Sequence, residues 1–291
     1  MVVLNQLLLR SALVGCGLIT SGWLGASSAT AASIRGHALY APGAVVDHHD
    51  DLHDDTHEPE SFTLLGEKWG DSQVRGTPGG TVTYSYMPTG VSCNAEVAPE
   101  DRDENPCSTT ALADFMPTNF MAEIDRAFAV WEAVANIQFQ QVVDDGSAFN
   151  TSGAVADIRL AGHVFDGAFG VLAHAFAPRA GAPSFAGDIH FDISETWKIG
   201  FGGPGFDIFQ VTAHEIGHAI GLDHTEVDNA LMAPFYSEAF RGPQADDIAG
   251  ARALYGPNPA SIPTPAMLPG LMGFGLGIWR KRRRSAAAVQ V

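Results

Sequence analysis

The residues most suited to chemistry lie in one run, residues 214–224, with the sequence HEIGHAIGLDH. His214 and His218 are four positions apart, so on a helix both imidazoles leave the same face and can bind one metal ion. Gly221 can adopt the left-handed conformation that ends a helix, which lets His224 turn back as a third ligand. Three histidine ligands leave a fourth tetrahedral position for water, which is typical of a catalytic zinc site.

Glu215 follows the first ligand and is expected to lie beside the metal without binding it. Zinc lowers the pKa of a bound water to about 7, so Glu215 can take a proton from the water and deliver it to a leaving amine. The alternative is an amphipathic helix with solvated histidines. Chance gives HExxH with the following glycine and third histidine in fewer than about one in ten thousand such chains, which favours the zinc site.

The motif resembles that of the metzincin metallopeptidases, with Met232 in the segment ALMAP as the Met-turn under the metal. Thr225 after the third histidine, and the segment PFY at residues 234–236, resemble the matrixin (matrix-metalloproteinase-like) branch. The resemblance covers about residues 77–256. It implies that Met232 packs without ligating zinc, and that Pro234 and Tyr236 wall the pocket for the side chain after the scissile bond.

The same resemblance implies a second metal site, a structural zinc, at His163, His174 and His190. The fourth ligand of the family is an aspartate at the position of Phe165, so Asp166 would have to serve or the site is incomplete. Each histidine alone is better explained as a hydrogen-bonded strand residue. Three at family positions favour zinc.

Calcium is the second cofactor that the resemblance implies. Asp166, Asp192 and Glu195 match calcium carboxylates of the family, and hard oxygen ligands suit calcium rather than zinc. Asp157 and Asp188 match a second calcium position less specifically. Because Asp166 cannot fully serve both metals, we assign it to calcium.

Three cysteines are present, and Cys16 lies in the segment that we expect to be removed. Cys93 and Cys107 then form an even pair in an exported protein, which predicts a disulfide worth roughly 3 kcal/mol. Two free thiols are the alternative. Many matrixins stay latent through a propeptide cysteine on the zinc, and here no cysteine lies between residues 33 and 92.

Composition divides the chain into five segments. Residues 1–32 read as a secretory signal peptide, although a weak lipoprotein-like box precedes Cys16. Residues 33–61 read as an acidic, histidine-rich, disordered propeptide or linker, residues 62–257 as the catalytic domain, and residues 258–265 as a proline-rich linker. Residues 266–291, apolar and then basic, resemble a PEP-CTERM sorting signal of Gram-negative bacteria and cyanobacteria.

These segments predict a secreted or cell-surface protein that contacts the membrane transiently through residues 266–291, with a stable tail anchor as the alternative. The net charge of -17 argues against nucleic acid as a partner. We expect a monomer that acts on protein or peptide substrates, aligned by β-augmentation along the strand that ends near residues 173–175.

Hydrophobic periodicity predicts an α+β domain with a twisted, mixed, five-stranded sheet and three helices, including the active-site helix. The resemblance to matrixins implies that this is the metzincin (zincin) fold. The expected helices span residues 119–134, 206–221 and 244–255, and the expected strands span residues 81–86, 137–142, 156–160, 171–176 and 188–191. The predicted function is a zinc endopeptidase. The alternatives are an inactive, metal-stabilised extracellular matrix protein and a zinc hydrolase of a non-peptide amide.

Overall fold

The computed structural model describes residues 37–44, 62–94, 106–149, 151, 153–179 and 185–261. All of them belong to one compact unit, Ser33–Val291. The predicted signal peptide and the predicted C-terminal sorting segment lie outside the described residues. Within the described ranges, no helix is both long enough and apolar enough to cross a bilayer.

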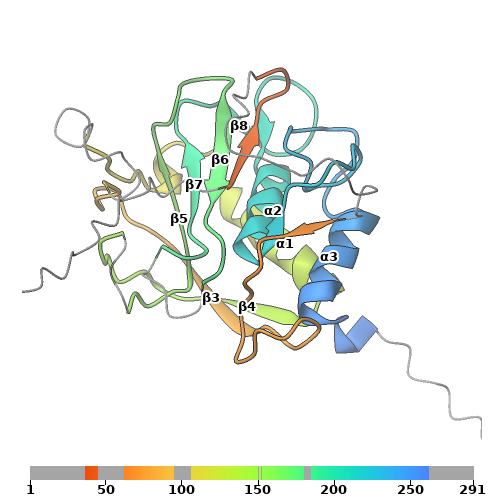
Figure 1. Ribbon diagram of the computed structural model, residues 1–291. Coiled ribbons are helices and arrows are strands. Elements are labelled where there is room, and N and C mark those ends of the chain that lie inside the picture. The colour runs from red at the N-terminus through yellow and green to blue at the C-terminus, as the bar shows by residue number, and fades with distance from the viewer. Residues whose placement is uncertain are drawn as a thin grey trace, which may run out of the picture. The chain divides into compact units, whose positions relative to one another are not determined.

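A mixed six-stranded sheet forms one layer of the domain, in the order β1-β6-β7-β5-β3-β4 (Figure 1). Neighbours are parallel from β4 to β7, whereas β6 is antiparallel to both β7 and β1. The strands are β1 (His37–Tyr40), β3 (Gly80–Tyr86), β4 (Ile137–Gln141), β5 (Ile158–His163), β6 (Val171–Ala175) and β7 (Ile189–Asp192). The sheet therefore has a mixed topology, as predicted, with β4 at one edge.

Among the described residues, three α-helices accompany the sheet: α1 (Phe120–Val134), α2 (Ile208–Ala219) and α3 (Ala245–Tyr255). The predicted apolar stripe of α1 is buried, and α1 packs against α2. Trp131 is fully buried in this interface, where its indole Nε1 donates to the Ala213 carbonyl at 2.9 Å. The first helix thereby fixes the position of the second, which carries the predicted zinc motif.

Short elements complete the described part of the chain: the 3-10 helices η1 (Leu112–Asp114) and η2 (Pro259–Ser261) and the strands β2 (Thr63–Leu64), β8 (Trp197–Lys198), β9 (Phe206–Asp207) and β10 (Leu222–Asp223). The pairing of β8 with β9 explains why α2 begins two residues later than predicted. Asp207 ends β9 and caps α2, because its Oδ1 accepts a hydrogen bond from the Gln210 amide at 3.0 Å.

The sixth strand, β1, corrects the prediction of a five-stranded sheet and, for residues 37–44, the prediction of disorder that was made for residues 33–61. The rest of that range lies outside the described residues. The acidic run that suggested disorder begins at Asp47, whereas His37–Tyr40 carries no carboxylate. These four residues extend the sheet beside β6, and Leu39 is only 2% exposed. The folded domain therefore includes residues before the predicted start at residue 62.

Candidate active site

Helix α2 and the turn after it bring the three predicted zinc ligands together. His214 Nε2 lies 3.0 Å from His218 Nε2, which lies 3.2 Å from His224 Nε2. Gly221 has a φ of +106°, as predicted for the residue that ends the helix, and a Cβ atom there would overlap the Glu67 carbonyl oxygen. Only glycine permits both this conformation and this close approach.

The ring orientations fit a bound cation. His214 Nδ1 lies 2.6 Å from the Leu231 carbonyl, and His218 Nδ1 lies 2.9 Å from the Leu222 carbonyl. Carbonyl oxygens only accept, so both Nδ1 atoms carry the proton and both Nε2 atoms present a lone pair to each other. Burial, followed by the charge of His224, lowers the pKa of His214 to about 3. Neutral rings with convergent lone pairs are what zinc requires.

Glu215 is fully buried next to the first ligand. Burial raises the pKa of its carboxyl well above the ordinary value, and the backbone amide of Leu39, which faces this carboxyl, acts in the opposite direction. A carboxylate with raised proton affinity is suited to accept a proton during a reaction.

The predicted Met-turn packs directly under α2. A Cβ atom at Gly217 would overlap the Met232 sulfur, so the thioether touches the helix backbone at that glycine. Two amides of the turn donate to one carboxylate: Leu231 N–H to Asp247 Oδ2 at 2.8 Å, and Met232 N–H to Asp247 Oδ1 at 2.9 Å. Asp247 also completes the capping box of α3 with Gln244.

Sequence reasoning missed the roles of Gly217 and Asp247. The spacing of Gln244 and Asp247, three residues apart at the start of a predicted helix, was the available signal for a capping box. The contact from Asp247 to the Met-turn is a tertiary contact that no local pattern indicates.

Strand β1 lies between β6, the strand predicted to align a substrate, and residues 234–236, the predicted wall of the substrate pocket. It pairs with β6 on one side, and on the other the Tyr40 amide donates to the Pro234 carbonyl at 3.0 Å. The Tyr236 amide in turn donates to the Tyr40 carbonyl at 3.0 Å. Figure 1 shows this red-orange strand beside β6. The predicted pocket residues thus contact a segment of the chain itself, which sequence reasoning did not foresee.

The second predicted set of histidines also comes together. His163 on β5, His174 on β6 and His190 on β7 have ring nitrogens within 4.8 Å of one another. Phe165, at the place of the family's aspartate, stacks on His174 with ring centroids 4.7 Å apart. The Asp166 carboxylate accepts from the Val171 amide at 3.1 Å, so it serves the loop that leads into β6.

The predicted calcium carboxylates are placed in two different ways. Burial raises the pKa of Glu195, and the negative charges of Asp192 and Asp166 add to the rise, although amides of residues 169 and 170 oppose it. Asp157 instead accepts from the amide and hydroxyl of Thr83, and Asp188 accepts from the Arg159 amide at 2.9 Å. The first three acids therefore influence one another, while the other two support neighbouring strands.

The predicted disulfide between Cys93 and Cys107 is present. Its formation is consistent with an oxidising environment.

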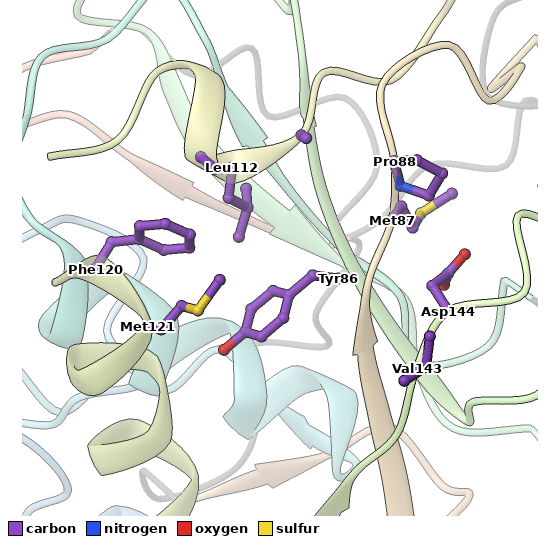
Figure 2. Close-up of a pocket in the computed structure, with 10 residues that line it drawn as sticks. Tyr86, Met87, Pro88, Leu112, Phe120, Met121, Val143 and Asp144 are labelled. Atoms are coloured by element: carbon purple, nitrogen blue, oxygen red, sulfur yellow. The ribbon is translucent and has the colours of Figure 1, made fainter. Parts of the chain in front are cut away.

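A separate pocket lies around Tyr86 (Figure 2), and its lining includes none of the histidines. Its single carboxylate, Asp144, is already paired with the buried Arg159 at 2.8 Å. The pocket therefore offers apolar surface rather than chemistry. Its lining residues are Tyr86, Met87, Pro88, Ala111, Leu112, Ala113, Phe120, Met121, Val143 and Asp144.

Comparison with known proteins agrees with this geometry. The matrixin family model matches residues 108–256. The chain is 44% identical over 160 residues to the hatching enzyme of Paracentrotus lividus, which covers 51% of this chain and 24% of that protein. It is 38% identical over 151 residues to karilysin of Tannerella forsythia, which covers 49% of this chain and 30% of that protein.

A third relative is human matrix metalloproteinase-16, 39% identical over 157 residues, which covers 49% of this chain and 24% of that protein. The chain thus spans about a quarter to a third of the length of these curated relatives.

Proposed function

Because the chain belongs to the matrixin family, we propose that it is a zinc-dependent endopeptidase that hydrolyses peptide bonds in proteins or peptides. The observation that carries this proposal is the convergence of three histidine Nε2 atoms beside the buried Glu215. Beside them, β1 pairs with β6 on one side and bonds to residues 234 and 236 on the other, so backbone donors and acceptors line both sides of the groove that a peptide would fill in place of β1.

His214, His218 and His224 would hold the catalytic zinc. When bound, zinc supplies Lewis-acid chemistry, because it acidifies water and polarises a carbonyl group. Glu215 holds the proton of the attacking water at a carboxylate oxygen and delivers it to the nitrogen of the leaving amine. The Leu231 and Leu222 carbonyls hold the imidazoles of His214 and His218 by their Nδ1 atoms, so that the Nε2 atoms converge where they would bind the metal.

The groove would align a substrate as an added strand. The edge of β6 that β1 covers would offer main-chain hydrogen bonds to a substrate once β1 has left it, and Pro234 and Tyr236 would wall the pocket for the side chain after the scissile bond. The Tyr236 hydroxyl accepts from the Asp207 amide at 3.0 Å and donates to the Glu238 carboxylate at 2.8 Å. These two hydrogen bonds fix the position of the ring. A fixed wall favours one class of side chain.

Two further sites would support the domain without taking part in the reaction. His163, His174 and His190 would hold a structural zinc, and Asp166, Asp192 and Glu195 would hold calcium. Asp192 is fully buried and its Oδ2 has no hydrogen-bond partner among the described residues. A buried carboxylate oxygen of this kind calls for a cation.

The proposal includes export through residues 1–32, action outside the cell or at its surface as a monomer, and transient membrane contact through residues 266–291. The disulfide supports an oxidising compartment.

Digestion of a denatured protein mixture, with and without 1,10-phenanthroline, tests the proposed reaction. We expect cleavage that the chelator stops and that added zinc restores. Cleavage that continues unchanged in the chelator would contradict the proposal, and so would a protein that takes up zinc yet cuts no peptide bond. A panel of non-peptide amides, run in parallel, would detect a hydrolase of another class.

A further inference from the structure

The strand β1 is held in the groove from both sides. On the β6 side it is antiparallel, with Ala38 opposite His174 and Leu39 opposite Ala173. On the other side Tyr40 forms a parallel bridge with Phe235. A segment that pairs with both walls at once occupies the place of an added substrate strand.

Main-chain hydrogen bonds fix this segment beyond β1 as well. Besides the two bonds that join Tyr40 to Pro234 and Tyr236, the Ala41 amide donates to the Gly170 carbonyl at 2.9 Å. Leu39 is 2% exposed, so its side chain is seated in the interior. One buried apolar side chain with a paired backbone is how a peptide binds in extended form.

The register places one particular peptide bond at the catalytic residues. The His37 ring lies 5.2 Å from the ring of His218, centroid to centroid, and His37 Nδ1 lies 3.3 Å from Asp223 Oδ1. Two residues later, Leu39 lies in the same buried cluster as Ile216 of α2, the helix that carries Glu215 and packs against β1. The carbonyl between them belongs to Ala38. The bond from Ala38 to Leu39 therefore lies between His37, which is beside a zinc ligand, and Leu39, which packs against the helix that carries the base.

We propose that Ala38–Leu39 is a self-processing site, a peptide bond that the chain presents to its own active site in the direction of a substrate. This inference rests on the proposed endopeptidase function. Water adds across the bond: the carbonyl carbon of Ala38 gains a C–O bond and becomes a carboxylate, and the C–N bond breaks. Glu215 takes a proton from the water and delivers it to the nitrogen of Leu39, which becomes the new N-terminus.

The seated strand also accounts for latency without a cysteine. While residues 37–41 fill the groove, another peptide cannot pair with β6. Cleavage breaks the covalent link between Ala38 and Leu39, so the residues before Leu39 can dissociate. The new N-terminus, Leu39 to Ala41, is then held by its own hydrogen bonds alone, and its release from β6 and residues 234–236 opens the groove to other substrates.

The proposal is tested by determining the N-terminal residue of the purified, zinc-loaded full chain, by intact mass and by N-terminal sequencing. We expect the parent to accumulate a form that begins at Leu39. Glu215→Ala should retain residues 37–41, because it lacks the base. Pro42→Ala, a change at an exposed residue next to the segment, should be processed as the parent is.

Two variants test whether processing requires β1 to be bound in the groove, and they leave the catalytic residues unchanged. Leu39→Lys places a charge on the buried side chain, and Tyr40→Pro removes the amide that donates to Pro234. Both should lose processing at Ala38–Leu39 yet digest casein without the delay that the parent shows while its own bond is being cut. Two independent changes guard against a variant that fails to fold.

Casein digestion separates the two proposals. If the parent and Leu39→Lys digest casein while the parent keeps residues 37–41 intact, the self-processing site is refuted and the endopeptidase stands. If neither the parent nor the two seating variants digest casein, although circular dichroism shows them folded and zinc is bound, both proposals fail. A Glu215→Ala chain cut at Leu39 during purification would assign the cleavage to another protease and refute the inference.

Discussion

The two histidine trios use the same ligand type in opposite surroundings. His214 and His218 leave one helix, with a buried glutamate beside them and strand β1 packed along the helix. The other trio, at His163, His174 and His190, comes from three strands and is surrounded by the aromatic rings of Phe149, Phe165 and Phe176. Ligand identity alone does not separate catalysis from scaffolding. A neighbouring base and access for a substrate do.

The largest effect that would test this contrast is removal of the base. Glu215→Ala should lower kcat/KM on a peptide substrate by about 10² or more, because no other side chain takes the proton. Zinc content should stay at the parental value, since Glu215 is not a ligand. The exposed Glu226→Ala is a matched control two residues past His224, and the proposed role fails if both variants are equally active at equal zinc content.

Loss of one ligand from each trio should separate the roles of the two sites. His218→Ala and His190→Ala should each bind one zinc ion fewer than the parent, measured by atomic emission on dialysed protein. Only His218→Ala should lose activity outright. His190→Ala should instead melt at a lower temperature while its remaining molecules keep turnover. A His190→Ala protein with undiminished zinc would remove the second trio from the metal sites.

The support under the catalytic trio is tested by Gly217→Ala. At an open helix position this change stabilises by up to about 1 kcal/mol, because alanine favours the helix. Here the added methyl would overlap the Met232 sulfur, and overpacking of this kind costs about 1–3 kcal/mol. Urea unfolding should therefore show a loss. A gain in stability would mean that the Met-turn does not press on α2.

The contrast also explains what could be read from the sequence. The catalytic trio spans eleven residues, and helical spacing with the stop at Gly221 determines it almost alone. The disulfide could be predicted from the two cysteines that remain after the signal peptide and from the expected export of the protein. Strand β1 could not be read in this way, because its partners β6 and residues 234–236 are distant in sequence and HALY has no strong strand pattern. The bond of Asp247 to the Met-turn is equally non-local.

Phe165 is where the second trio departs from the family, so Phe165→Asp should strengthen it. An aspartate at this position, next to the ring of His174, would add an anionic fourth ligand to three neutral ones. We expect the second zinc to bind about tenfold tighter, roughly 1.4 kcal/mol, in a competition titration with a chromogenic chelator. Val164→Asp, at the exposed neighbour, should leave the affinity unchanged. Equal gains from both variants would indicate a general charge effect.

The smallest expected effect concerns the acidic cluster at Asp166, Asp192 and Glu195, which adjoins the loop of the second trio. The negative charges of Asp166 and Asp192 contribute to the raised pKa of Glu195, so a cation should relieve their repulsion. Binding to the folded state alone at about five times Kd stabilises by about 1 kcal/mol, which raises the melting temperature by roughly 2–4 °C.

Millimolar calcium should produce this rise in protein already saturated with zinc, whereas the exposed Asp71→Ala should respond as the parent does. Asp192→Ala should lose most of the rise, because the buried oxygen that has no other partner is gone. Its melting temperature without calcium is not the readout, since Asp192 Oδ1 also accepts from the Ser194 amide at 2.8 Å. The calcium-dependent increment isolates the cation. A parent protein whose melting temperature is the same with and without calcium would leave these carboxylates as an acidic turn that binds no cation.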